Sequence, residues 1–326
     1  MARKFTRTPR AFCIAASTWA LFATAVQSTP PVSAEGVYGL LCAFLNSDGG
    51  QQKLDAPFTG SFATSVPSGN SLRLISWNID RGYGFDGIIA TLRQKNPDLC
   101  LLQEVDLHDR RTKNRDIARE LAEKLTYNYA FGIEFQELSQ GTGEQAAYQG
   151  QATLSRWPIV KTRIIRFERQ SGWWKPHTII PNAAFFQRRL GGRIALVTDL
   201  SINGTLVVAY NLHLESRSGG SIQWAQLREV LADLKHYPDG TAAIIGGDLN
   251  SKYNPSSVRR FLEAQGFHNV LGQKLTRTHV IIGYLDWIFY RGPWQVDQKM
   301  VLRGTHASDH DPIVAQLVPN ASRGSR

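Results

Sequence analysis

Strand-like and helix-like segments alternate along the chain from Leu72 to about Val318. Short apolar runs predict strands at residues 72–77, 99–105, 242–245, 285–290, 299–303 and 313–318. Residues 99–105 are nearly all apolar, as in a strand that is buried on both faces. Asn203-Gly204 separates two further apolar runs, 194–200 and 206–214, and predicts a tight hairpin between them.

Helical spacing of apolar residues marks three other segments. The first covers residues 85–94, and the second runs from Ile117 to Leu125 behind Asn114, which we expect to cap it. The third runs from Trp224 to Leu234. Hairpins mixed with strand–helix units favour an α/β (α+β) domain over residues 71–318, with antiparallel strand pairs in its sheets.

The N-terminal 34 residues differ from the rest of the chain. A basic head ending at Arg10 precedes an uncharged, Ala-rich stretch, and Val32-Ser33-Ala34 offers a small-residue cleavage site. This pattern predicts a signal peptide and an exported protein, periplasmic or secreted, although a retained anchor and a transit peptide remain open. We expect residues 35–70 to form a linker or N-terminal extension and residues 319–326 a disordered tail.

Composition limits the classes of function. Of the 326 residues, 42% are hydrophobic and 20% charged, which is typical of a globular chain. Three cysteines without a Cys-x-x-Cys motif exclude a disulfide scaffold and a cysteine-based zinc site. Cleavage after Ala34 would reduce the net charge from +10 to 33 − 27 = +6. This modest excess suits a polyanionic substrate or an acidic surface, but a need for solubility would also explain it.

Polar residues recur where the predicted strands end, which is where α/β proteins place their sites. They are Asn78, Glu104, His213, Asp248, Asn250, Asp286, Asp309 and His310. Singly, most are explained equally well as turn formers, caps or satisfied strand residues. Asp286 is different, because Leu285 and Trp287 flank it. A buried carboxylate needs a partner, and an imidazole would serve.

One motif suggests a different class of enzyme. Residues 82–87 match Gly-x-Gly-x-x-Gly after a strand, with Glu104 placed like a ribose-binding acid, which is typical of dinucleotide-binding oxidoreductases. However, residues 78–81 separate the strand from the first glycine, where that site needs a tight turn. The oxidoreductase interpretation also leaves the acids of the second half unexplained.

Seven segments in order resemble the endonuclease/exonuclease/phosphatase superfamily, whose fold is shared with deoxyribonuclease I. They are Leu-Ile-Ser-Trp-Asn-Ile from Leu74, Leu-Leu-Gln-Glu-Val-Asp from Leu101, Gly-Gln-Ala-Thr-Leu-Ser-Arg-Trp-Pro-Ile from Gly150, Asn-Leu-His-Leu from Asn211, Gly-Gly-Asp-Leu-Asn from Gly246, Leu-Asp-Trp-Ile-Phe from Leu285 and Ser-Asp-His-Asp-Pro-Ile from Ser308. The resemblance implies a four-layer α/β/β/α sandwich of two packed mixed sheets, with the site at one rim. It also implies hydrolysis of a phosphate ester with Mg²⁺, or Mn²⁺ in its place.

The resemblance also implies roles for these residues. Glu104 would hold the metal ion, with Asp309 and Asn78 completing or supporting its shell, as oxygen donors suit a hard cation. Asp248 and Asn250 would hold the attacking water, and we expect Asp248 to be the general base. His310, paired with Asp286, and His213 would contact the scissile phosphate.

The expected function is therefore an exported, magnesium-dependent phosphodiesterase, in the first place an endonuclease. A sphingomyelin-type phospholipid phosphodiesterase, a phosphoinositide phosphatase and an inert binding protein remain alternatives. Arg111 and Arg193 are candidates for gripping phosphates, and Trp173 and Trp174 for stacking on bases or entering a lipid interface. A solvated basic face and tryptophans that cover the core explain these four residues equally well. We expect a monomer without an obligate protein partner.

Overall fold

The computed structural model describes residues 54–175, 185 and 187–320. The predicted signal peptide, most of the N-terminal extension and the tail from residue 321 lie outside this range. All elements below belong to one compact unit, Gln52–Arg326. None of the helices in this described part is long and apolar enough to cross a lipid bilayer.

The described residues form two mixed sheets. The nine strands of the first are, in spatial order, β1 (Phe58–Ser61), β5 (Asn128–Glu137), β6 (Tyr148–Ser155), β3 (Leu99–Asp109), β2 (Leu72–Arg81), β15 (Ile313–Pro319) and β14 (Trp294–Val301), with β4 (Arg115–Asp116) beside β3 and β8 (Arg189–Gly191) beside β5. The six of the second are β12 (His268–Asn269), β13 (Asp286–Arg291), β11 (Ala242–Asp248), β10 (Thr205–His213), β9 (Ile194–Ile202) and β7 (Ile159–Arg166). Each contains one parallel pair, β2/β3 and β10/β11.

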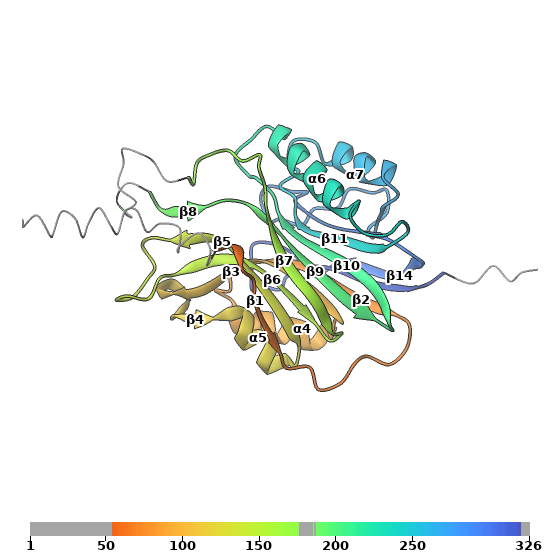
Figure 1. Cartoon of the computed structure of the whole chain (residues 1–326), viewed down its shortest axis with the longest axis horizontal. Coiled ribbons are helices and arrows are strands. Elements are labelled where there is room, and N and C mark those ends of the chain that lie inside the picture. Colours follow the sequence, from red (N-terminus) through yellow and green to blue (C-terminus); the bar gives the residue numbers. More distant parts are fainter. Residues whose placement is uncertain (1–53, 176–184, 186, 321–326) are drawn as a thin grey trace, which may run out of the picture. The chain divides into compact units, whose positions relative to one another are not determined.

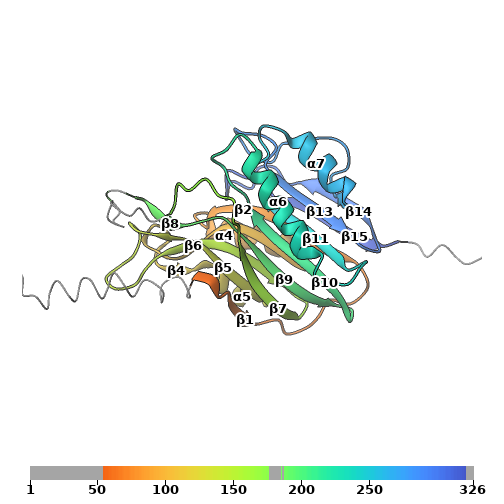
Figure 2. The same cartoon turned by 45° about the horizontal axis from the view of Figure 1, so that its top comes forward.

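Helices cover the outer faces of both sheets, which confirms the predicted four layers (Figures 1 and 2). Helices α4 (Phe85–Lys95) and α5 (Ile117–Leu125) pack on the first sheet, and α6 (Ser221–Leu234) and α7 (Pro255–Ala264) pack on the second. A short 3₁₀ turn, Arg110–Thr112, follows β3.

Strand β2 shows why the core has this form. Its Leu72 and Leu74 belong to the apolar layer between the sheets, whereas Ile75 and Trp77 face the helices. Successive side chains of a strand point to opposite faces, so a strand that is covered on both faces must be apolar throughout.

A buried amide fastens the two sheets together near the site. Asn211 on β10 donates to the carbonyl oxygens of Leu102 and Ala152 in the first sheet, at 3.0 and 2.9 Å. Gln103 in turn donates to Asn211 Oδ1 at 2.7 Å. Gln103 and Asn211, two polar residues of the sequence motifs, therefore have a structural role in holding the two sheets together.

The predicted strands and helices are present, with three differences from the local predictions, whereas helix α7 and strands β4 to β8 and β12 were not predicted. The hairpin turns at Asn203 and Gly204, both with positive φ, as predicted. The cap of α5 is Asp116, whose carboxylate accepts from the Arg119 amide, so the prediction of Asn114 was wrong. Residues 58–61, expected in the extension, form strand β1 along β5, and β14 begins at Trp294, five residues before the predicted strand.

Candidate active site

The carboxyl ends of the two parallel strand pairs lie around one pocket. Its volume is about 200 Å³, and it is lined by Asp80, Arg81, Glu104, Arg193, His213, Ser216, Asp248, Asn250, His279, Ile282, Leu285, Asp309 and His310. Six of the eight strand-end residues singled out in the sequence are therefore in its wall. The other two, Asn78 and Asp286, lie directly behind it, in contact with Asp248 and His310 respectively.

Three of the predicted catalytic residues lie in a row across the second sheet. His213 on β10 is the register partner of Asp248 on β11, and Asp248 is the partner of Asp286 on β13. All three are at least 97% buried. Sheet register thus brings together two carboxylates and an imidazole that are far apart in the sequence.

His310 closes this row from the loop before β15. Its Nδ1 lies 2.8 Å from Asp286 Oδ2, and its Nε2 lies 3.8 Å from Asp248 Oδ2. Burial alone would lower the pKa of His310, but the carboxylates, Asp286 first, outweigh it and raise the pKa to about 10. His310 is therefore a cation at neutral pH, with Nε2 directed toward the pocket side of Asp248.

Asp248 is held in position from two sides. The Asn250 amide donates to its Oδ1 at 2.9 Å, and the Asn78 side-chain amide donates to its Oδ2 at 3.3 Å. Burial and the neighbouring Asp286 raise the pKa of Asp248 to about 6, against the opposing effect of His310. The raised pKa brings this carboxylate closer to the range that suits proton exchange with water.

His213 behaves in the opposite way to His310. Burial, then the nearby Arg193, lowers the pKa of His213 well below its usual value, so the ring is neutral. Its Nε2 lies 3.7 Å from Asp248 Oδ2. Asp248 thus lies between a charged imidazole, His310, and a neutral one, His213.

Acidic groups gather at the other side of the pocket. Asp80 and Glu104 both pair with the Arg81 guanidinium, which lies 3.3 Å from Glu104 Oε2. Burial raises the pKa of Asp80 most, and Asp309 and Glu104 raise it further. Burial would raise the pKa of Glu104 too, but Arg81 and Arg193 pull it below its usual value.

The backbone at these acids is unusual. Asp80, Arg81, Glu104 and Asn250 all have positive φ, between +43° and +63°. Register shifts interrupt the strand pairing at residues 78–81 of β2 and at 102–105 of β3. Non-glycine residues with positive φ are uncommon and concentrate at functional sites, where such bulges redirect side chains.

Sequence reasoning missed three charged or titratable residues of the pocket. Asp80 and Arg81 directly follow the first motif, which ends at Ile79, and their charge beside a strand end was the available signal. His279 carried no signal, because it precedes the Leu285 motif by six residues. Its Nε2 lies 3.4 Å from Asp309 Oδ2, and its ring meets that of His310 edge-on at 4.6 Å.

The four candidate substrate-binding residues have different positions relative to the pocket. Arg193 lines the pocket, where it donates to Glu134 Oε1 at 2.6 Å. Arg111 does not reach the pocket, because Asp106 holds its guanidinium through two 2.7 Å hydrogen bonds. Trp174 packs edge-on against Phe135, whereas the neighbouring Trp173 is exposed.

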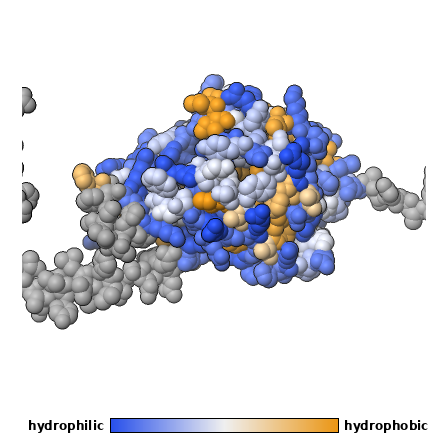
Figure 3. Space-filling view, turned by 90° about the horizontal axis from the view of Figure 1, so that it is seen from above, coloured by the Kyte–Doolittle hydropathy of each residue, from blue (hydrophilic) through white to orange (hydrophobic). Residues whose placement is uncertain are grey.

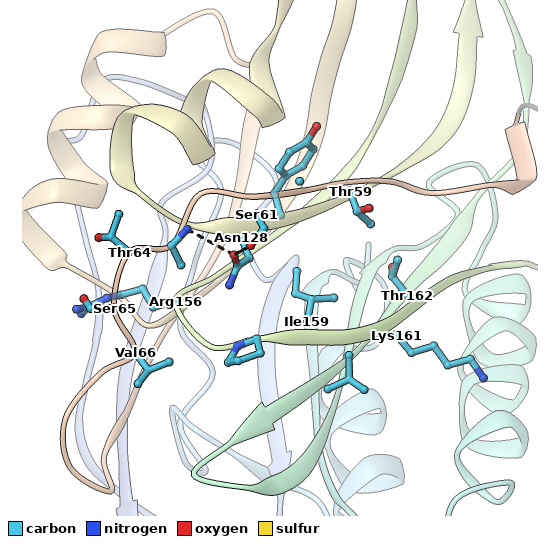
Figure 4. Close-up of a pocket in the computed structure, with 15 residues that line it drawn as sticks. Thr59, Ser61, Thr64, Ser65, Val66, Asn128, Arg156, Ile159, Lys161 and Thr162 are labelled. Carbon is cyan, nitrogen blue, oxygen red and sulfur yellow. Dashed lines mark hydrogen bonds between the residues drawn. The ribbon is translucent and has the colours of Figure 1, made fainter.

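A larger groove of about 700 Å³ lies between β1 and the start of β7 (Figure 4). Hydroxyl groups, Asn128, Arg156 and Lys161 line it, and Ser61 donates to Asn128 Oδ1 at 2.6 Å. None of the described residues in its wall is an acid or a histidine. It therefore lacks groups for acid–base or metal chemistry at neutral pH.

Residues 75–310 match the model of the Endonuclease/Exonuclease/phosphatase family, which covers more than half of the chain and every residue described at the pocket. The chain belongs to this family. Enzymes of the superfamily hydrolyse phosphate esters, so the resemblance read from the seven motifs is confirmed.

Solved structures have the same fold. The endonuclease/exonuclease/phosphatase of Beutenbergia cavernae is 19% identical, with a TM-score of 0.57 over 78% of this chain and 73% of that one. The family member from Bacteroides vulgatus is 15% identical, with a TM-score of 0.56 over 77% and 100%. Truncated TDP2 of Caenorhabditis elegans is 21% identical, with a TM-score of 0.52 over 76% and 97%.

The UPF0294 protein YE0917 of Yersinia enterocolitica is 28% identical over 128 residues. This match covers 38% of the chain, which spans about half the length of that relative (48%).

Proposed function

We propose that this protein is an exported, metal-dependent phosphodiesterase. The observation that carries the proposal is the arrangement of Asp248 between a charged His310 and a neutral His213, in a pocket whose wall also contains Asp80, Glu104 and Asp309. Membership of the family supports hydrolysis of a phosphate ester, and these residues would provide a base, a cation and oxygen ligands for a metal ion.

The acidic face fits a divalent cation. Asp80, Glu104 and Asp309 supply only oxygen donors, and Arg81 neutralises just one of their three charges. Oxygen donors with residual negative charge are what Mg²⁺ and Mn²⁺ prefer. A cation there would neutralise the phosphate and stabilise the developing charge. Asn78 contacts Asp248, so we assign it to positioning that carboxylate.

The remaining steps belong to the protein's own groups. Asp248 accepts a proton from the attacking water, since its carboxylate is fixed by two amides and has a pKa of about 6. His310 donates through Nε2 to a phosphate oxygen, with Asp286 holding Nδ1. His213 is a neutral donor or acceptor on the opposite side of Asp248. Positioning and charge stabilisation are most of what phosphoryl transfer requires.

The test is hydrolysis of bis(p-nitrophenyl) phosphate and p-nitrophenyl phosphate by the purified protein. We expect cleavage of the diester with Mg²⁺ or Mn²⁺, none with EDTA, and slower cleavage of the monoester. A faster monoester reaction would favour a phosphatase, and no hydrolysis of either would favour the binding protein. N-terminal sequencing of the natural protein tests export, which predicts a chain that begins near Glu35.

The residues around the pocket bear on the choice between nucleic acid and phospholipid as the substrate. Of the two arginines considered for gripping phosphates, Arg193 lines the pocket, whereas Asp106 holds Arg111 away from it. Nucleic acid remains one candidate, because a chain that begins at Glu35 would have 33 basic and 27 acidic residues, a net charge of +6. A phospholipid is the second candidate, favoured by the exposed apolar side chains around the pocket.

A further inference from the structure

Three consecutive aliphatic side chains are exposed at the edge of the pocket. Val280, Ile281 and Ile282 are 64%, 82% and 50% exposed, and Ile282 itself lines the pocket. On the face that Figure 3 shows, apolar side chains form small separate groups on a largely polar surface. Exposed apolar residues that cluster beside a site indicate a contact surface, whereas scattered ones need no explanation.

The loop that presents these side chains is held in place by polar contacts. His279 Nδ1 accepts from the amides of Ile281 and Ile282 at 2.9 and 3.0 Å. The Arg277 guanidinium donates to the carbonyl oxygens of Val280 and Ile281, at 3.0 and 3.4 Å. The backbone is thus satisfied while the aliphatic side chains point into solvent.

Two exposed aromatic side chains, Tyr253 and Trp173, are connected to the pocket wall through cations. Tyr253, 64% exposed, has Lys252 Nζ 5.1 Å from its ring centre, and this Nζ donates to the carbonyl oxygen of the pocket residue Ser216. Trp173, 58% exposed, has the Arg217 guanidinium 4.9 Å from its ring centre.

One side-chain hydrogen bond and the chain itself connect these elements to the pocket. Ser251 Oγ donates to the Tyr284 carbonyl at 2.6 Å, which places the Lys252–Tyr253 segment beside the 280–284 loop. Arg217 directly follows Ser216 in the pocket wall. We call the set Trp173, Arg217, Lys252, Tyr253, Arg277 and Val280–Ile282 the rim.

The composition of the rim is that of a bilayer-binding surface. Aliphatic side chains enter the acyl region, Trp and Tyr favour the headgroup boundary, and Lys and Arg attract anionic lipid. Nucleic acid would use the two aromatic rings and the cations. It would not account for Val280 and Ile281, which have no π-face for stacking.

We propose that the rim docks on an anionic phospholipid bilayer and brings the phosphodiester of a lipid headgroup to the pocket. The docking depends only on the rim, whereas the identity of the substrate rests on the proposed phosphodiesterase function. Hydrolysis at such a lipid would add water across one P–O bond, leaving a phosphomonoester and an alcohol.

The docking is tested by cosedimentation with vesicles, in EDTA so that catalysis does not contribute. The full chain is mixed with phosphatidylcholine vesicles containing or lacking 30% phosphatidylglycerol. The test variant is Val280→Ser with Ile281→Ser, and the matched control is Val66→Ser with Val160→Ser, two exposed valines of the groove in Figure 4. All proteins carry the same N-terminus.

We expect binding to the anionic vesicles, a loss of at least about tenfold in the test variant, and no change in the control. Equal binding by wild type and test variant, or no binding by the wild type, would overturn the proposal. The proposal would also be overturned if an oligonucleotide bound the wild type more tightly than the vesicles do and bound the test variant only weakly.

Catalysis supplies a second, independent measurement. With Mg²⁺, the test variant should keep its rate on soluble bis(p-nitrophenyl) phosphate, because neither substituted residue lines the pocket. Its apparent KM for phospholipid in vesicles should rise about tenfold or more. Vesicle binding without hydrolysis of any diester would support the docking and contradict the proposed function. Hydrolysis of the soluble diester without vesicle binding would support the proposed function and contradict the docking.

Discussion

The Nδ1 atom of His310 lies 2.8 Å from Oδ2 of Asp286, and both side chains are buried. Asp286 begins strand β13, while His310 lies in the loop before β15. A carboxylate in this place stabilises the protonated ring through Nδ1 and leaves the N–H at Nε2 free to act in the pocket.

Replacing Asp286 with Asn tests this relationship. We expect Asp286→Asn to keep the fold and to lower kcat by roughly 10²–10⁴-fold with little change in KM, because the imidazolium loses its partner. Steady-state kinetics on the soluble diester, together with a thermal melt, measure both effects. Asp297→Asn, an exposed position on β14, is the control. An unfolded variant or an unchanged kcat would show that Asp286 is only structural.

Glu104→Gln should abolish metal binding while the protein stays folded. The change keeps the size of the side chain but removes a carboxylate whose pKa is held low by Arg81 and Arg193 against burial. We expect at least a tenfold loss in Mn²⁺ affinity by titration calorimetry, a matching loss of activity, and a thermal stability that is unchanged or higher. The exposed Glu123→Gln on α5 is the control. Retained Mn²⁺ affinity would exclude Glu104 as a ligand.

Gly247 allows β11 to lie against β10 next to Asp248. Its φ is +136°, and a Cβ there would lie 1.9 Å from the Leu212 carbonyl oxygen. Gly247→Ala should therefore lower the free energy of unfolding by about 3 kcal/mol or more. Gly204→Ala in the hairpin, where φ is also positive but the space is open, should cost only about 1 kcal/mol. Urea denaturation compares the two, and equal costs would contradict the steric argument.

Asp109 should make stability depend on pH. Burial, then the neighbouring Asp106, raises the pKa of Asp109 to about 8. The unfolded chain releases this proton near pH 4, so between about pH 4 and 8 the folded chain binds more protons. The free energy of unfolding should then fall as pH rises through this window, by up to about 1.4 kcal/mol per unit. Urea denaturation at pH 5 to 8 should give a weaker dependence for Asp109→Asn than for wild type or for the exposed control Asp239→Asn.

Local patterns were sufficient for eight of the fifteen described strands, whereas the four layers followed only from the family resemblance. A run such as 99–105 is apolar because both faces of β3 are covered, and that requirement is visible in the residues themselves. Asn203-Gly204 specifies its turn through positive φ, which is also a local property. Most of the site residues could be predicted for the same reason, since they lie within or next to apolar runs.

Only the tertiary structure decided which of these side chains meet. The row His213, Asp248 and Asp286 depends on sheet register between three strands, and the sequence contains no local trace of that pairing. Arg111 and Arg193 look alike in the sequence, yet Asp106 holds one away from the pocket while the other lines it. A bulge in β2 places Asp80 and Arg81 in the site, and a β-bridge to His310 places His279 there. Short-range patterns determine what a segment becomes, whereas the partners of a buried charge depend on packing between distant segments.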